Sequence, residues 1–319
     1  MKISLIIPIY GVERYISRCV HNLFNQSGAE LEYIFVNDAT QDSSMEILRD
    51  IISKEYSELK DKVNIINKPI NEGLPQARKT GVAVATGDYI MHCDSDDWLA
   101  DGAIKIIAEE INRTNADIIY FGHYISVDGK ARESIEKEQT SPFSYLADII
   151  SFSSTSGAFC WNKVIKRELY DYVEEWPKYN MHEDVALMPQ IIYHATSISF
   201  INQPLYYYRC DSTSSMSNDY QKNKEKRMQS KENMQIVIRF MEKNNLTKIL
   251  RKQYQQLISR CAYNAAFFDK KSIPLELPLY ASLWKFPIFF NFDVSIRRQL
   301  QSRIVIMYYH IKHWLSFAQ

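Results

Sequence analysis

The chain has 319 residues, 46% of them hydrophobic and 13% aromatic, and its 38 basic and 38 acidic side chains give a net charge of zero. This length and composition predict a globular protein with a substantial core, arranged as two domains or as one large domain with an appendage. No uninterrupted apolar run approaches the roughly 20 residues that span a bilayer, so we expect no transmembrane helix.

The cysteines and the N-terminus indicate a reducing compartment. Five cysteines are widely spaced, at positions 19, 93, 160, 210 and 261, and no two form a C-x-x-C pair. This pattern predicts neither a disulfide framework nor a zinc site. The apolar run at 3–8 follows a single basic residue and is too short for a signal peptide, so we expect a cytoplasmic protein.

The zero net charge hides an asymmetry. Residues 1–210 carry 20 basic and 30 acidic side chains, whereas residues 211–319 carry 18 basic and 8 acidic ones. Two interpretations stay open: two units with different partners, or two parts that complement each other electrostatically.

Apolar runs and helical spacing alternate along the first hundred residues. Strands are expected at 3–8, 33–36, 63–66 and 89–93. Helices are expected between them at 12–25, after the serines 43 and 44 with apolar residues from Ile47 to Ile52, and at 74–85. This alternation predicts a parallel, doubly wound sheet. Ligands of such sheets bind beyond the carboxyl ends of the strands. Polar signals occur there in three places: Pro8-Ile-Tyr10, Asn37-Asp38 and Asp94 to Asp96.

The rest of the chain is less regular before it becomes helical. A helix is expected at 104–112, a strand at 117–121, a least ordered polar segment at 126–141 and a helix from His182 onward. The aromatic residues 204–209 indicate a strand or turn. Helices are then expected at 220–244, 246–268 and 294–317.

The apolar strand ending at Cys93 runs into Asp94-Ser95-Asp96-Asp97. Because side chains alternate along an extended strand, Asp94 and Asp96 should point to the same side. A divalent cation would relieve their repulsion, and Mg²⁺ and Mn²⁺ prefer oxygen ligands. The alternative is an acidic turn, and we expect Asp97 and Asp101 to cap the helix that starts near Gly102.

A parallel sheet with polar residues at its strand ends indicates a protein that binds a nucleotide. The first strand continues as Tyr10-Gly11-Val12-Glu13, which is not G-x-G-x-x-G, and no P-loop sequence exists. A divalent ion on Asp94 and Asp96, helped by Arg78, could neutralise a diphosphate instead. Asp38 accepts hydrogen bonds only, which suits the imide N–H of a base such as uracil. A turn residue at Asp38 and a solvated helix residue at Arg78 are the alternatives.

Five motifs follow one another along roughly the first hundred residues: Ser4-Leu-Ile-Ile-Pro8-Ile-Tyr10, Val36-Asn-Asp38-Ala-Thr40-Gln-Asp42-Ser43, Asn71-Glu-Gly73-Leu-Pro-Gln-Ala77-Arg78, Gly87-Asp-Tyr-Ile90 and Asp94-Ser-Asp96-Asp97. Taken together, these motifs resemble the GT-A fold family 2 glycosyltransferases of the bacterial surface-polysaccharide type. This resemblance implies a GT-A α/β fold, a mostly parallel sheet flanked by helices, and an inverting, metal-dependent enzyme with a nucleotide-sugar donor. The family usually has an acidic residue at the position of Asn37.

The resemblance also implies roles for residues of the donor half. Asp96 would ligate Mn²⁺ or Mg²⁺, and Asp94 would contact the ribose or the metal. The remaining donor-binding residues would be Pro8, Tyr10, Asp38, Arg78 and Ser95.

Fewer residues of the acceptor half resemble those of the family. In Met181-His-Glu183-Asp184, Asp184 would be the catalytic base, with Glu183 the second candidate and His182 structural. A helix N-terminus that complements the macrodipole is the alternative. Trp161-Asn-Lys163 resembles a segment near the acceptor, where Trp161 would stack on a sugar or pack in the core, and Asp97 is a further acceptor candidate. Residues 206–209 and 212–215 resemble a segment that closes over the diphosphate.

We therefore predict a GT-A catalytic domain over residues 1–210, with a nucleotide-binding half at 1–100 and an acceptor half at 101–210, followed by a basic helical region at 211–319. The enzyme would transfer a sugar, from UDP for preference, to a hydroxyl of a glycan or lipid-linked glycan in cell-surface polysaccharide biosynthesis. Two alternatives are a nucleotidyltransferase, which would need a glycine- and arginine-rich loop after the first strand, and a non-catalytic sugar- or nucleotide-binding protein.

The basic region has two interpretations. Its amphipathic helices interleave basic and aromatic residues, which is typical of a helix at a membrane interface. This would place the enzyme on the inner face of the plasma membrane. Packing on the catalytic domain or in a homodimer is the alternative, and no nucleic acid is expected, because no recognised module accompanies the charge.

Overall fold

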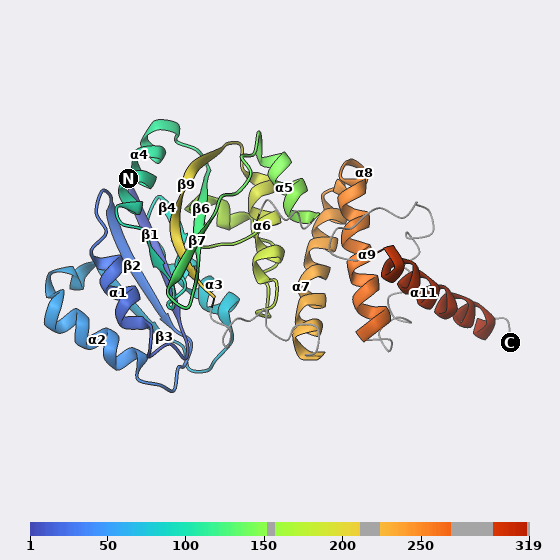
Figure 1. Ribbon diagram of the computed structural model, residues 1–319, viewed down its shortest axis with the longest axis horizontal. Helices are drawn as coiled ribbons and strands as arrows, with labels where there is room; N and C mark the ends of the chain where they lie inside the picture. Colours follow the sequence, from blue (N-terminus) through green and yellow to red (C-terminus); the bar gives the residue numbers. More distant parts are fainter. Residues whose placement is uncertain (152–156, 211–223, 269–295, 318–319) are drawn as a thin grey trace.

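The computed structural model describes residues 1–151, 157–210, 224–268 and 296–317 (Figure 1). The strands are β1 Lys2–Ile9, β2 Glu30–Asn37, β3 Val63–Asn67, β4 Tyr89–His92, β5 Trp98–Leu99, β6 Ile118–Val127, β7 Lys130–Ser134, β8 Lys163–Lys166 and β9 Ile198–Arg209. The helices are α1 Ile16–Phe24, α2 Ser44–Glu55, α3 Leu74–Val84, α4 Ala103–Thr114, α5 Pro142–Ile150, α6 Glu183–His194, α7 Lys224–Lys243, α8 Leu246–Ile249, α9 Arg251–Phe268 and α11 Ile296–Phe317, with 3-10 turns η1 Ser57–Lys62 and η2 Arg167–Tyr172.

The described strands form one mixed sheet in the order β3-β2-β1-β4-β8-β6-β9-β5, and β7 pairs with β6. The first four are parallel, as predicted, and β6 and β9 are also parallel. Strand β8 lies antiparallel between β4 and β6 and so joins the two parallel parts. The predicted α/β architecture is confirmed, in a sheet that is mixed.

The hydrophobic sequence of β1 explains its central position. Seven of its eight residues are buried, as expected for a strand covered on both faces. Alternate side chains enter different cores: Leu5 and Ile7 pack with residues of α1, α2 and α4, whereas Ile6 packs with Ala77 of α3 and residues of α6. The sheet therefore lies between two layers of helices, and its carboxyl edge stays open.

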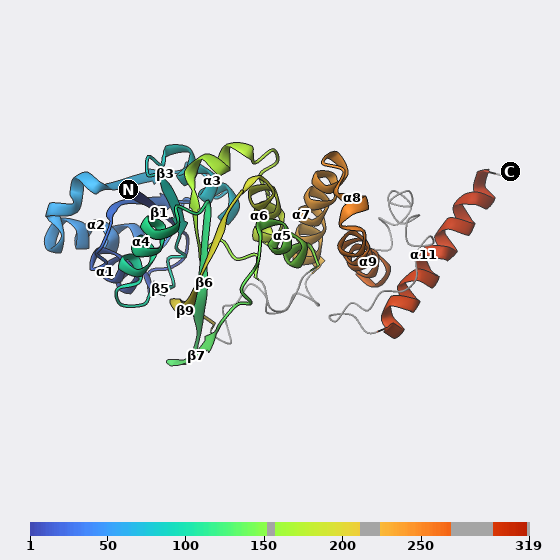
Figure 2. The same ribbon diagram turned by 90° about the horizontal axis from the view of Figure 1, so that it is seen from above.

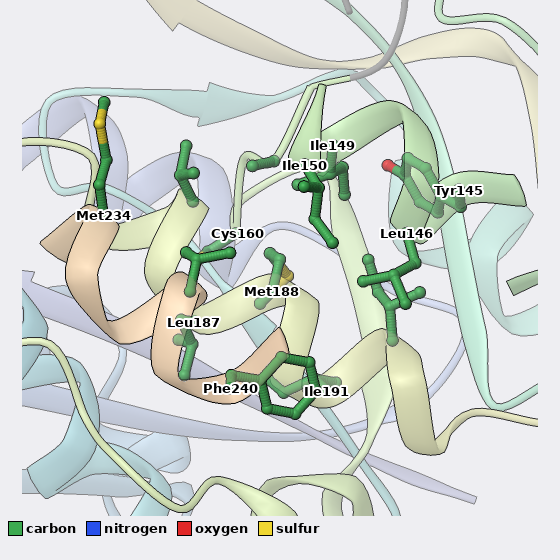
Figure 3. Packing of buried hydrophobic residues seen from close by; sticks show 14 of the residues in the cluster. Tyr145, Leu146, Ile149, Ile150, Cys160, Leu187, Met188, Ile191, Met234 and Phe240 are labelled. Carbon is green, nitrogen blue, oxygen red and sulfur yellow. The ribbon is translucent and has the colours of Figure 1, made fainter. Parts of the chain in front are cut away.

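The later helices continue the second layer away from the sheet. Both ribbon views show α6, α7, α9 and α11 in succession, with α11 farthest from the sheet (Figure 2). Leu187 and Ile191 of α6 lie beside Phe240 of α7, and Met234 of α7 belongs to the same core (Figure 3). Among the described residues, the α7 and α9 part of the basic region thus shares one core with the sheet.

Several expectations were wrong in detail. The segment 126–141, predicted to be least ordered, contains β7, which pairs with β6 through a turn at Asp128 and Gly129, both with positive φ. Residues 246–268, predicted as one helix, form α8 and α9 with a break at Leu250. The predicted cap of α4 by Asp97 and Asp101 is also wrong, because the N-cap is Gly102, and the first-turn amide of Ile104 donates to Gln26 Oε1 instead.

Some predictions concern residues outside the described ranges. These are the serines at 212–215 and four aromatic residues of the basic region, Trp284, Phe286, Phe289 and Phe290. In the part of the chain that the structure describes, no helix is both long and apolar enough to cross a membrane.

Candidate active site

A cavity of about 530 Å³ opens at the carboxyl ends of β1, β2 and β4. This is where a parallel sheet is expected to bind its ligand. Every predicted site residue except Asp97 lines it: Pro8, Tyr10, Asp38, Arg78, Asp94, Ser95, Asp96, Trp161, Glu183 and Asp184. The structure therefore brings together residues that are up to 176 positions apart in the chain.

The acidic stretch after β4 is a turn and not an extended strand. The amide of Asp97 donates to the carbonyl of Asp94 at 3.0 Å, and β4 ends at His92. Asp94 and Asp96 both reach the cavity, but because of this turn and not through strand alternation. Ser95 is buried between them.

Strand β9 holds the acidic turn from behind. The Tyr206 hydroxyl accepts a hydrogen bond from the Asp94 amide at 3.0 Å and donates to Asp97 Oδ2 at 2.8 Å. The Arg209 amide donates to Asp97 Oδ1 at 2.7 Å. Asp97 is 1% exposed, and burial raises its pKa well above the usual range. Asp97 therefore anchors the turn and does not face the cavity.

Asp96 is partly exposed to the cavity and pairs with Arg209, whose Nη2 lies 2.6 Å from Asp96 Oδ2. The Asp96 carbonyl accepts a hydrogen bond from Arg18 at 3.0 Å. Burial, and then the charge of Asp94, raise the pKa of Asp96 despite the arginine. A cation bound beside Asp96 would favour its charged form and so oppose the effects of both burial and the Asp94 charge.

The residues present fit a divalent cation. Asp94 and Asp96 offer carboxylate oxygens to one cavity, which is the donor type that Mg²⁺ and Mn²⁺ prefer. Among the described residues, no three His, Cys, Asp or Glu side chains converge on a single point. An ion held by two carboxylates would keep positions open for phosphate oxygens, as Mg²⁺ does at substrate sites.

Arg78 connects the two sides of the cavity. Its Nη2 donates to Asp94 Oδ1 at 2.6 Å, and its Nη1 donates to Glu183 Oε1. Arg78 is 2% exposed, so the alternative of a solvated helix residue is excluded. Burial would lower the pKa of Arg78, but Asp94 and Glu183 outweigh it and raise the pKa well above the usual value.

Glu183 and Asp184 open α6 and have different environments. Glu183 is buried against Arg78, and burial raises its pKa to about 7, with Arg78 opposing the shift. Asp184 is partly exposed, and its Oδ1 accepts a hydrogen bond from the Val185 amide at 2.8 Å. Asp184 is thus the more accessible of the two carboxylates for a substrate proton.

Asp38 organises the turn before α3. Its carboxylate accepts hydrogen bonds from the amides of Glu72 at 3.0 Å and Gly73 at 2.8 Å, and it pairs with Lys68 at 2.8 Å. Asp38 still lines the cavity next to Tyr10, which is 54% exposed. A contact between Asp38 and a base stays a prediction.

Trp161 belongs to an aromatic stack. Phe159 stacks on it at 4.6 Å between ring centroids, and Tyr206 and Tyr208 stack at 4.7 and 5.4 Å. Trp161 is 5% exposed, so the structure favours packing over stacking on a sugar. The next two residues, Asn162 and Lys163, are fully buried, and Lys163 Nζ donates to the carbonyls of Gly157 and Phe159.

The sequence did not point to three cavity residues. Phe159 and Cys160 lie beside Trp161, and Asn180 accepts a hydrogen bond from the Leu74 amide at 2.9 Å. Burial keeps the Cys160 thiol protonated by raising its pKa. Asn180 has no recognisable motif, and only its position just before His182 could have suggested a role.

Comparisons with known proteins give one consistent match. Residues 4–173 match the family model described as glycosyl transferase family 2. The chain is 28% identical over 219 residues, 65% of its length, to glycosyltransferase GlyA of Streptococcus pneumoniae serotype 4. It is 32% identical over 151 residues, 46% of its length, to a poly(ribitol-phosphate) beta-glucosyltransferase of Bacillus spizizenii. The chain spans 30% and 23% of those two proteins.

Among solved structures, S. aureus TarS 1-349 in complex with UDP-GlcNAc superimposes with a TM-score of 0.60 and 19% identity. The superposition covers 98% of this chain and 92% of that one. At this identity the likeness concerns the fold, and the predicted GT-A fold is confirmed.

Proposed function

Since the chain belongs to glycosyl transferase family 2, we propose that it transfers a sugar from a nucleotide-sugar donor to a hydroxyl group of a cell-surface glycan. One observation carries the proposal: a single cavity is lined both by Asp94 and Asp96, which follow β4, and by Asp184 at the start of α6. The poly(ribitol-phosphate) beta-glucosyltransferase named above supports a polymer as the acceptor.

We assign the donor half to Asp94 and Asp96, with Mn²⁺ or Mg²⁺ as the cofactor. When bound, the metal ion would act as a Lewis acid that stabilises the departing diphosphate. Arg78 and Arg209 pair with these two carboxylates and would lie near the same charge. Pro8, Tyr10 and Asp38 line the part of the cavity where we place the nucleoside.

We assign the acceptor half to Asp184. An inverting transfer is a single in-line displacement. Asp184 takes the proton of the acceptor hydroxyl, the acceptor oxygen forms a bond to the anomeric carbon, and the bond from that carbon to the diphosphate breaks with its electrons leaving on the phosphate. General-base assistance of this kind is typically worth about 10²–10⁴-fold. Glu183, bound to Arg78, is the less suitable base.

A UDP-sugar is the favoured donor. The support is the exposed Tyr10 beside the acceptor-only carboxylate of Asp38, together with the UDP-GlcNAc that the TarS structure contains. A glycan or lipid-linked glycan would be the acceptor.

We further propose that α11 lies on an anionic membrane surface on the cytoplasmic side. Among the side chains of α11 that the structure describes, five exposed apolar ones occur at helical spacing: Leu300, Ile304, Met307, Tyr308 and Ile311. The opposite side of the helix packs on α9 through the buried Ile306. The sequence of α11 contains no acidic residue, as expected of a helix that approaches anionic lipid. A homodimer is the other occupant to be tested.

The experiment for the proposed function is a screen of nucleotides by thermal shift, with and without Mn²⁺, followed by mass spectrometry of products from a panel of nucleotide sugars. We expect metal-dependent stabilisation by UDP and release of UDP from one donor. No stabilisation by any nucleoside diphosphate in Mn²⁺ would overturn the proposal.

A further inference from the structure

The segment 177–184, which carries the proposed base, has little regular structure before α6 begins at Glu183. His182, the N-cap of α6, has a positive φ of 58°, a conformation that non-glycine residues seldom adopt. The side chain of His182 makes no capping hydrogen bond to the helix. The position of Asp184 therefore depends on contacts that other elements make to this segment.

Helix α7 supplies contacts on one side. Asn233 Nδ2 donates to the carbonyl of Tyr179 at 2.7 Å and to the carbonyl of Met181 at 2.9 Å. The Ser230 hydroxyl and His182 Nδ1 share a hydrogen bond of 2.8 Å. Ser230 and Asn233 are fully buried and lie three residues apart, so they face the segment from one side of α7.

Helix α3 supplies contacts on the other side. The Leu74 amide donates to Asn180 Oδ1 at 2.9 Å, and Gln76 donates to the carbonyl of Pro177 at 2.7 Å. Gly73 leaves room for Asn180, since a Cβ there would lie 2.6 Å from Asn180 Oδ1. The segment is thus held between the helix that carries Arg78 and the first described helix of the basic region.

We propose that Ser230 and Asn233 are positioning residues that fix the catalytic base Asp184 through segment 177–184. The inference rests on the proposed function and extends it, because it gives α7 a part in the reaction. α7 is a firm support, because Met234, Val237 and Met241 are buried in the core that α6 shares. Two charge-free hydrogen bonds to backbone carbonyls hold the chain without adding a charge beside the base.

The test uses the full chain and four variants. Asn233→Leu keeps the size of the side chain and removes both donors, and Ser230→Ala removes the hydroxyl, whereas Ser230→Thr keeps it. Asn244→Leu is the matched control, because Asn244 Nδ2 also donates to a backbone carbonyl, that of Phe240, at the far end of α7. We expect Asn233→Leu to lower kcat at least tenfold and Ser230→Ala about threefold, with the donor KM within twofold of wild type. Ser230→Thr and Asn244→Leu should behave as wild type.

Two further readouts separate positioning from a merely structural role. When Asp184 is already replaced by Asn, adding Asn233→Leu should lower kcat by less than a further twofold, because both changes act on the same step. Hydrogen exchange of the amides in 178–184 should be faster in Asn233→Leu and unchanged in Asn244→Leu.

A full tenfold loss in the Asp184→Asn background, or wild-type protection of 178–184 in Asn233→Leu, would overturn the inference. A wild-type chain that transfers no sugar would overturn the proposed function instead, and the exchange comparison would still decide whether α7 holds the segment.

Discussion

Arg78 and Glu183 lie 105 residues apart in the sequence and form an ion pair shielded from solvent at the base of the cavity. The same guanidinium binds Asp94, so one side chain joins the end of β4 to the start of α6. The donor side and the acceptor side of the proposed reaction are thereby held at a fixed separation.

Replacing Arg78 should therefore cost both stability and turnover. Arg78→Met leaves two carboxylates without their cation, and breaking a buried pair in this way typically costs about 3–5 kcal/mol. We expect a loss of free energy of unfolding of that order in urea titration, together with a kcat at least tenfold lower. Lys79→Met, at the exposed neighbouring position, is the control and should change neither. Wild-type stability in Arg78→Met would contradict the bridge.

Glu183 should make stability depend on pH. Its pKa is raised by burial to about 7 from an ordinary 4.5, so between these values the folded chain holds a proton that the unfolded chain has released. The stabilisation is complete below about pH 4.5 and is lost as the pH rises toward 7. The side chain in Glu183→Gln cannot titrate. As the pH rises from about 4.5 to 7, the melting temperature of wild type should therefore fall relative to that of this variant. A difference that is constant with pH would contradict the buried environment of Glu183.

Asp96 should control metal-dependent donor binding. Asp96→Ala removes a carboxylate that faces the cavity, together with its ion pair to Arg209. We expect the stabilisation by UDP in Mn²⁺ to fall to the level seen without metal, measured by thermal shift. Asp101→Ala is a control outside the cavity lining. Unchanged UDP affinity in Mn²⁺ would move the metal ligand elsewhere.

The exposed face of α11 should bind anionic lipid. Ile304→Glu places a charge in the middle of the apolar face, and we expect the full chain to lose at least tenfold in binding to phosphatidylserine-containing vesicles in a flotation assay. Ile249→Glu, at an exposed apolar position on α8, is the matched control. A wild-type chain that remains unbound but forms a concentration-dependent dimer, disrupted by Ile304→Glu, would assign this face to a second copy.

The sequence predicted those parts of the fold and the site whose residues are neighbours in the chain. The strand β1 and the acidic stretch Asp94 to Asp97 are each contiguous in the sequence, and the family motifs placed them at one edge of a sheet. The acidic stretch was nevertheless predicted to be extended, and it forms a turn. The roles of Asp97 and Arg209 are set by the contact between the acidic turn and β9, which ends at Arg209 and lies more than a hundred residues later in the chain. No local pattern reveals this contact. Strand β8 was missed for a similar reason, because Lys163–Lys166 is short and gains its hydrogen bonds from β4 and β6.

The sequence also could not predict that Glu183 and Asp184 have different environments. The two carboxylates are adjacent in the chain, and a helix N-terminus attracts both equally. Only the position of Arg78 shows that one of them is buried in an ion pair and that the other is left toward the cavity.

The central claim is that Asp94 and Asp96 serve the donor while Asp184 serves the acceptor, and Asp184→Asn tests it most directly. The measurement pairs UDP binding in Mn²⁺ with the rate of sugar transfer for the same protein sample. The proposed roles predict wild-type UDP affinity with turnover lower by roughly 10²-fold or more. Turnover near the wild-type rate would contradict Asp184 as the base, and a loss of UDP binding in proportion to the loss of rate would contradict the division between the two halves.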